Sequence, residues 1–247
     1  MEQTLHLQRR IAVVGATSGI GRAAAELLRA RGHAVLAIGR DPAKLDALAR
    51  AADSAAAAGS LVVGRADGAD GDAVRALLHT HAPIDDLVIA ASGGKGAGPF
   101  AGLALDELRA GFEQKFWVHL TTLQAALDGL APDASITLIT AISARTAAPG
   151  TSGLAAINGA LETMVPILAR ELAPRRVNAI SPGIIDTPWW AGVPEPARGE
   201  IFAAYAASTP LGRVGEAHEV AHAIAFVVEN RYVTGSVLEV AGGYQMV

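Results

Sequence analysis

Short runs of β-branched and aliphatic residues alternate along the chain with longer segments in which apolar residues recur every three or four positions. The first pattern predicts buried strands and the second predicts amphipathic helices. The expected strands are 11–14, 34–38, 61–63, 87–91, 136–139, 177–180 and 237–240, and the expected helices are 20–31, 43–52, 73–81, 105–130, 154–172 and 217–228. Because alternation of this kind indicates βαβ units, we expect a Rossmann-type, doubly wound parallel sheet of about seven strands with helices on both faces.

The segment 184–209 interrupts this alternation. It contains three prolines and the pair Trp189–Trp190, and it is longer than an ordinary connection between elements. We therefore expect a functional loop or lid there. No composition shift elsewhere indicates a domain boundary, so residues 1–247 are expected to form one domain.

Composition narrows the function classes. An apolar fraction of 51% with 18% charged residues is typical of a large folded core. The net charge of −4 gives no electrostatic basis for nucleic-acid binding, and no apolar run approaches the ~18–20 residues of a membrane span. The chain has no cysteine, and its seven histidines lack metal-ligand spacing. We expect a cytoplasmic protein without a metal, a nucleic-acid partner or a membrane partner.

Closely spaced glycines separate the first expected strand from the first expected helix. Glycine at such positions permits a tight turn and lets the backbone approach a pyrophosphate, which the free N–H groups of the helix start then bind. The loop residues expected to hold a dinucleotide are Gly15, Thr17, Ser18, Gly19, Ile20 and Gly21.

The end of the second expected strand indicates which dinucleotide is bound. An acidic residue there would accept hydrogen bonds from the ribose 2′-hydroxyl of NAD. The chain instead has Gly39 followed by Arg40, whose guanidinium can pair with a 2′-phosphate. The alternative is that Arg40 is only a solvated loop residue. The pattern favours NADP(H) over NAD.

Several motifs, in register, resemble the short-chain dehydrogenase/reductase family. The glycine loop is similar to the family's T-G-x-x-x-G-x-G, with Val14 in place of the threonine, and 177–188 is similar to V-N-x-x-x-P-G-x-x-x-T. Matches at 211–213, 219–221, 234–235 and 242–243 extend the resemblance over essentially the whole chain. It implies adenine contact by Asp67 and carboxamide contact by Thr187, with further cofactor contacts at Gly68, Ala91, Ser92, Gly93, Asn158, Pro182, Gly183 and Ile185.

The residues that carry the family's chemistry do not match. That chemistry uses a tyrosine, a lysine one helical turn later, a serine and an upstream asparagine. In the register set by 168–172, these positions hold Leu154, Asn158, Ala141 and His119. Leucine has no proton to give, and asparagine carries no positive charge. The chain therefore resembles an atypical member that lacks the Ser-Tyr-Lys residues, and tyrosine-dependent carbonyl reduction is not expected.

Four side chains with exchangeable protons are candidates for a replacement: Lys115, His119, Thr140 and Ser143. Lys115 and His119 lie four residues apart and share one helix face. With lowered pKa values they could act as acid or base, and histidine ordinarily titrates near 6.5. The alternatives are that Lys115 is solvated and that His119 only binds a backbone carbonyl.

Three further residues bear on the substrate. Arg145 could orient an anionic substrate. Trp189 and Trp190 could cover an apolar substrate or form an oligomer contact, and the sequence does not choose between the two.

Three functions follow from these residues. The first is an atypical short-chain oxidoreductase that uses NADP(H) on a small organic carbonyl or alcohol with a non-tyrosine proton donor. The second is a catalytically silent NADP(H)-binding sensor or partner subunit, and the third is a non-redox lyase, cyclase or isomerase. The cofactor features favour the first two. The resemblance, together with apolar residues on several faces of 105–130 and 154–172, implies a homodimer or homotetramer.

Overall fold

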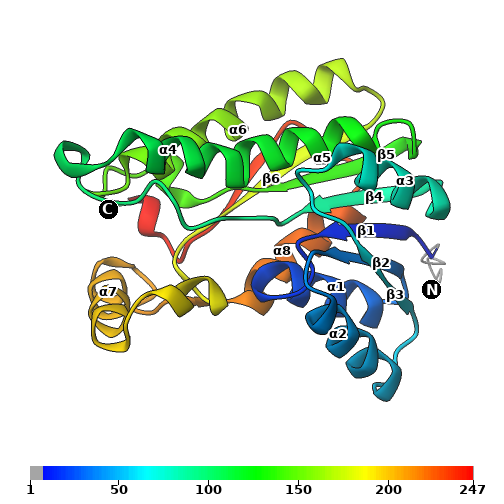
Figure 1. Ribbon diagram of the computed structural model, residues 1–247, viewed down its shortest axis with the longest axis horizontal. Helices are drawn as coiled ribbons and strands as arrows, with labels where there is room; N and C mark the ends of the chain where they lie inside the picture. The colour runs from blue at the N-terminus through cyan, green and yellow to red at the C-terminus, as the bar shows by residue number, and fades with distance from the viewer. Residues whose placement is uncertain (1–7, 247) are drawn as a thin grey trace.

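Seven parallel strands form one sheet in the order β3-β2-β1-β4-β5-β6-β9 in the computed structural model, which describes residues 8–246 (Figure 1). The strands are β1 (Arg10–Val14), β2 (Ala34–Gly39), β3 (Ser60–Arg65), β4 (Ile84–Ile89), β5 (Leu130–Ile139), β6 (Arg176–Pro182) and β9 (Val237–Val240). The main helices are α1 (Gly19–Ala30), α2 (Pro42–Ser54), α3 (Gly71–His81), α4 (Leu105–Phe112), α5 (Val118–Ala126), α6 (Ser152–Glu171), α7 (Glu195–Ser208) and α8 (Ala217–Glu229). The expected doubly wound sheet in a single domain is confirmed.

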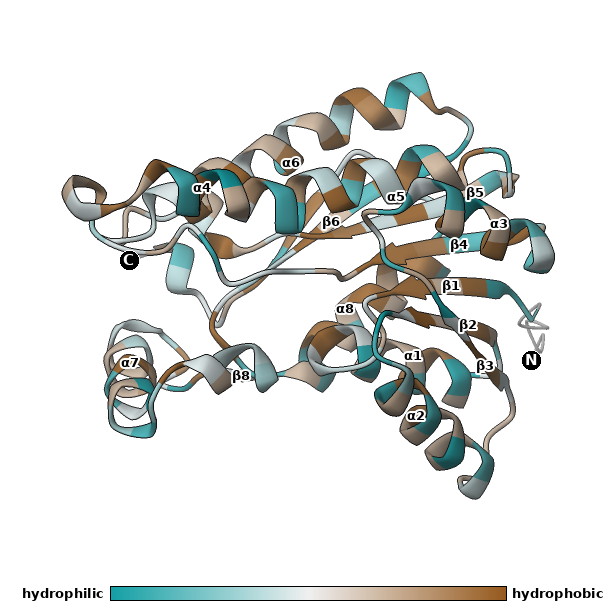
Figure 2. Ribbon diagram, viewed as in Figure 1, coloured by the Kyte–Doolittle hydropathy of each residue, from teal (hydrophilic) through white to brown (hydrophobic). Residues whose placement is uncertain are grey.

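Both faces of the sheet are covered because successive strand residues point to opposite sides. In β1, Ile11 and Val13 pack with α1, α2 and α8, whereas Ala12 and Val14 pack with α3, α5 and α6. Figure 2 shows the central strands in brown, as expected for strands buried on two faces. The chain leaves β1 toward β2 and β3, then returns to β4 on the other side of β1, so the strand order reverses between β1 and β4.

β4 and β5 begin earlier than the hydrophobic pattern indicated. β4 includes Asp86, which is fully buried because Arg9 pairs with it through Nε at 2.5 Å. β5 begins at Leu130, and its pairing with β4 shifts register after that residue. Both strands contain polar residues near their starts, so the hydrophobic pattern did not reveal where the strands begin.

The expected helix 105–130 ends earlier, at Ala126, because Leu130 already begins β5, and it consists of three pieces. α4 is followed by a π-helical turn, η2 (Glu113–Trp117), and then by α5. A π-helical turn adds a residue to the helix and changes which side chains face inward. Lys115 lies within this turn and is only 8% exposed.

The segment 184–209 is ordered and largely helical. β7 (Ile185–Asp186) pairs with β8 (Gly215–Glu216), and the short helix η4 (Pro188–Gly192) leads into α7. Pro194 and Pro196, which indicated a loop, start α7, where a missing N–H needs no partner. In Figure 1, α7 stands apart from the other helices, beyond the ends of the strands.

Within residues 8–246, α6 alone is long and apolar enough to meet the length and composition of a membrane span. Leu161 and Val165 of α6 are fully buried in the monomer, and Val165 packs against the sheet. We therefore interpret α6 as a core helix.

Candidate functional site

The glycine loop lies at the carboxyl end of β1 and leaves no room for side chains. Gly15 has φ +85°, and a Cβ there would lie 2.8 Å from the backbone of Ala90 and Ala91. A Cβ on Gly21 would lie 2.3 Å from the carbonyl oxygen of Gly15. Glycine at these positions lets α1 start directly against the ends of β1 and β4, where the strand order reverses. Open α/β sheets bind ligands at such a point.

α1 begins without a side-chain cap, unlike α2 and α3. Asp41 accepts a hydrogen bond from the Ala43 N–H (2.9 Å) at the start of α2, and Asp70 accepts one from the Ala73 N–H (3.0 Å) at the start of α3. Ser18 makes no such bond, and the first turn of α1 contains no acidic residue. The first N–H groups of α1 therefore remain available to an anion such as a pyrophosphate.

The end of β2 carries no acidic side chain. A Cβ on Gly39 would lie 2.4 Å from Thr17 Cγ2, so a larger residue there requires Thr17 to move. The side chain of Arg40 is 75% exposed, and its Nη1 lies 3.7 Å from Asp67 Oδ2. The guanidinium therefore has donors that face solvent beside the glycine loop.

The remaining expected cofactor residues, apart from Asn158 on α6, lie along the same carboxyl edge. The segment 184–209 lies next to the glycine loop, since a Cβ on Gly19 would lie 3.3 Å from Thr187 Cβ. The others follow the ends of three strands: Asp67 and Gly68 after β3, Ala91, Ser92 and Gly93 after β4, and Pro182, Gly183 and Ile185 from the end of β6 into the lid.

α6 brings Asn158 to the end of β5. Its Nδ2 donates to Ser143 Oγ (3.2 Å) and to the carbonyl oxygen of Leu154 (2.9 Å), and its Oδ1 is buried without a partner among the described residues. Leu154 lies one turn earlier on the same helix face, and Ala141 immediately follows Thr140 at the end of β5. The structure thus places Ser143, Asn158 and Leu154 together.

Lys115 enters this region from the π-helical turn. Its Nζ donates to the carbonyl oxygen of Thr140 at 3.1 Å. Burial lowers the pKa of Lys115 to about 8, and the charge of Glu162 opposes that shift. The amine therefore exchanges a proton near neutral pH, which is a property of groups that act as acid or base.

His119 lies on α5, one turn after Lys115, and its side chain is fully buried. Its Nδ1 donates to the carbonyl oxygen of Lys115 (2.8 Å). Burial, together with the charge of Lys115, lowers the pKa of His119 to about 4. The expected titration near 6.5 is therefore wrong for this side chain, which is a neutral imidazole at neutral pH.

A buried carboxylate, Glu162, completes the polar cluster and was absent from the sequence-based candidates. Its Oε1 accepts hydrogen bonds from Thr140 Oγ1 (2.7 Å) and Ser181 Oγ (2.8 Å), and its Oε2 accepts one from Arg145 Nε (2.8 Å). The available signal was its spacing: Glu162 stands four residues after Asn158, on the same face of α6.

Arg145 is held between two carboxylates. Its Nε pairs with Glu162 at 2.8 Å, and its Nη1 lies 3.4 Å from Glu239 Oε1. Two negative charges thus surround one positive charge. The hypothesis that Arg145 orients an anionic substrate is not supported by this arrangement.

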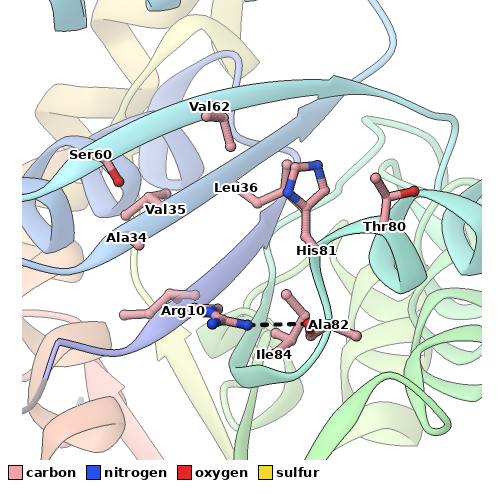
Figure 3. A pocket seen from close by; sticks show the side chains of 11 residues that line it. Arg10, Ala34, Val35, Leu36, Ser60, Val62, Thr80, His81, Ala82 and Ile84 are labelled. Carbon is pink, nitrogen blue, oxygen red and sulfur yellow. Dashed lines mark hydrogen bonds between the residues drawn. The ribbon is translucent and has the colours of Figure 1, made fainter.

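Two hollows mark opposite edges of the sheet. A cavity of about 330 Å³ is lined by the starts of four strands, including Arg10, Ala34, Ser60 and Ile84, and Arg10 donates there to the Ala82 carbonyl (Figure 3). This cavity lies at the amino edge, away from the glycine loop. A smaller hollow of about 190 Å³ lies at the carboxyl edge, where the lid segment meets Glu239.

The comparisons with known proteins agree with this geometry. A family model described as enoyl-(acyl carrier protein) reductase matches residues 15–245. Carbonyl reductase family member 4 of Danio rerio is 32% identical over 241 residues, spanning 96% of this chain and 98% of that protein. The chain belongs to the short-chain dehydrogenase/reductase family.

Solved structures of other short-chain dehydrogenases/reductases extend the comparison to the cofactor. A small-chain dehydrogenase in complex with NADPH has a TM-score of 0.80 and 29% identity, covering 97% of this chain and 100% of that one. A 3-oxoacyl-(acyl-carrier protein) reductase from Brucella melitensis with bound NAD has a TM-score of 0.83 and 28% identity, covering 98% and 93%. The family binds a nicotinamide cofactor, and its structures include both forms.

The residues of this short-chain dehydrogenase/reductase fit such a cofactor. The chain offers a close backbone approach at Gly15 and Gly21, an uncapped start of α1 and exposed donors on Arg40, which are groups of the kinds that bind phosphates. The polar cluster around Lys115 lies farther along the same edge, at the end of β5.

Proposed function

We propose that the chain is a cytoplasmic, NADP(H)-dependent oxidoreductase that interconverts a small organic carbonyl compound and its alcohol. The proposal is carried by one observation: a buried amine, Lys115, stands at the end of β5 on the edge where the glycine loop and the uncapped α1 lie. A bound nicotinamide supplies or accepts the hydride. The protein must then hold the substrate and move one proton.

For the cofactor, we assign the pyrophosphate to residues 15–21 and the adenosine 2′-phosphate to Arg40. Asp67, Gly68, residues 91–93, Asn158 and residues 182–187 complete the contacts. Since Gly39 has no acidic side chain to accept from a ribose hydroxyl and Arg40 follows it, the residues at the end of β2 favour a 2′-phosphate over a free hydroxyl.

The cofactor assignment is tested by affinity. NADPH should bind at least about tenfold more tightly than NADH, because a charge-assisted pair is worth roughly 1.5–3 kcal/mol. Arg40→Ala should remove most of that preference while leaving the NADH affinity nearly unchanged, as measured by calorimetry. Arg22→Ala, a change at an exposed arginine on α1, is the matched control. Equal affinities in the parent protein would contradict the assignment.

For the proton, we propose that Lys115 replaces the missing acid. We take Ala141, Leu154 and Asn158 to occupy the family's serine, tyrosine and lysine positions, so none of them can donate a proton to the substrate oxygen. Lys115 Nζ carries such a proton below its pKa of about 8. In this proposal the hydroxyl of Ser143, which accepts from Asn158 Nδ2, orients the substrate oxygen, while the hydroxyl of Thr140 donates to Glu162. Neutral His119, bonded to the Lys115 carbonyl, holds the turn that carries Lys115.

This assignment predicts the pH dependence of activity. A general acid must be protonated, so the reduction rate should hold below pH 8 and fall above it, whereas the oxidation rate should rise through the same region. Lys115→Met should lower kcat by ~10²–10⁴ and abolish the inflection. Turnover that survives Lys115→Met would move the role to Thr140 or Ser143. Tight NADPH binding without turnover of any carbonyl would instead identify a silent binding protein.

A further inference from the structure

The segment after β6 reaches the loop after β4. In the sheet, β5 lies between β4 and β6, and the segment 184–209 follows β6. Trp189 of this segment donates from Nε1 to the carbonyl oxygen of Gly93, in the loop after β4, at 3.0 Å. Residues 184–190, here called the roof, therefore pass from one neighbour of β5 to the other.

The roof carries aromatic side chains that contact one another. The rings of Trp189 and Trp190 meet edge to face at 4.7 Å, and Trp190 meets Phe202 of α7 at 5.5 Å. Trp190 also bonds within the segment, since its Nε1 donates to the Ile185 carbonyl at 3.1 Å. Ala141 after β5 and Leu154 on α6 add apolar side chains. Apart from the polar cluster, the side chains that we place around the substrate are therefore apolar.

The cations around this site are each balanced by a carboxylate. Arg145 is shared by Glu162 and Glu239. Lys95 of the Gly93 loop pairs with Glu107 at 2.8 Å, and Arg213 beside the lid pairs with both carboxylate oxygens of Glu219. Lys115 is buried and faces the charge of Glu162. An anionic substrate would thus meet carboxylates as often as cations. Removing water from its charge costs free energy, and no excess of positive charge at this site would offset that cost.

We infer that the substrate is an uncharged, apolar carbonyl or alcohol compound, without carboxylate or phosphate groups, whose flat part rests against Trp189. The inference deepens the proposed function and rests on it. Glu239 is the specificity device, because this second carboxylate at Arg145 leaves no positive charge available to an anionic substrate.

The test uses two probes that differ by one carboxylate, acetophenone and 4-acetylbenzoate. With NADPH and the full chain, kcat/KM for acetophenone should exceed that for 4-acetylbenzoate at least about tenfold, a difference of about 1.4 kcal/mol. Glu239→Gln leaves Arg145 with one carboxylate, so the preference should shrink at least about threefold through gain of the charged probe. Glu26→Gln, the same change at the exposed pair with Arg22, should leave the preference unaltered.

The aromatic contact is tested at Trp189. Trp189→Ala should raise KM for acetophenone about tenfold, whereas Trp189→Phe, which keeps a ring and loses the bond to Gly93, should recover most of that loss. Equal effects of the two variants, or a preference for 4-acetylbenzoate in the parent protein, would overturn the inference.

Failure of the proposed function gives a different result. If neither probe is turned over, calorimetric titration of NADP⁺-loaded protein, and of the protein alone, still measures their binding. Tighter binding of acetophenone than of 4-acetylbenzoate, with the difference reduced by Glu239→Gln, would support the inference without redox activity. Equal binding of both probes, or binding of neither, would refute it.

Discussion

His119 shows how one buried side chain connects the site to the stability of the fold. Its imidazole has no exposed surface, and its pKa is about 4 in the folded chain against an ordinary 6.5. Between these two values the unfolded chain binds more protons than the folded one. Stability should therefore fall as pH drops from 6.5 toward 4, by up to roughly 3 kcal/mol for this group.

His119→Asn should flatten that fall, because asparagine does not titrate. Urea unfolding of both proteins across this pH range measures the effect, and His79→Asn, at an exposed histidine of α3, is the control. Parallel pH profiles for the parent protein and His119→Asn would show that His119 does not carry the effect.

For individual residues, the sequence predicts spacing but not burial. Lys115 and His119 emerged as candidates from their spacing on a helix, but their pKa values follow from burial, which spacing does not reveal. Glu162 was missed because a glutamate in an Ala- and Leu-rich helix is ordinarily a solvated residue. Only the tertiary contacts with Thr140, Ser181 and Arg145 show that it is a buried partner.

At the scale of elements, the alternating pattern predicted the seven strands of the sheet because both faces of a parallel sheet are apolar. It did not predict the π-helical turn η2, since its one extra residue leaves the helical periodicity on either side nearly intact. That turn matters for function, because it is the element that presents Lys115. The lid helix α7 was missed for another reason: Pro194 and Pro196 resemble loop residues until the helix start is known.

The elements around the site also differ in how firmly they are held. α1 packs against both the sheet and the neighbouring helix α8, so the glycine loop has a rigid support. The segment 184–209 is joined to the rest by the short β7–β8 pair, by the bond from Trp189 to Gly93, and by Tyr205 of α7, whose hydroxyl donates to the Ala241 carbonyl at 3.1 Å. Tyr205 is buried, whereas Trp189 is 41% exposed, so the bond to Gly93 is more open to solvent than the contact through α7.

For the whole molecule, some of the exposed large apolar side chains lie on helices of the two layers that cover the sheet. On one of them, η2 packs against α6, and both leave large side chains in solvent: Trp117 is 49% exposed and Ile167 is 52% exposed. On the opposite layer, Phe226 of α8 is 48% exposed. Because soluble monomers rarely expose large contiguous apolar patches, we expect the surface formed by η2 and α6 to be covered by a second copy of the chain.

Light scattering should therefore give a mass of two or four times the 25.2 kDa chain. Placing charges in the contact, with Trp117→Glu and Ile167→Glu together, should yield a monomer, since an interface with unpaired buried carboxylates is strongly disfavoured. Phe226→Glu makes the same change on the other layer and should leave at least a dimer. Circular dichroism must show the helical content of the parent in each variant, so that dissociation is not confused with unfolding. A parent protein of 25.2 kDa at micromolar concentration would refute the assembly, and a monomer produced by Phe226→Glu alone would move the contact to α8.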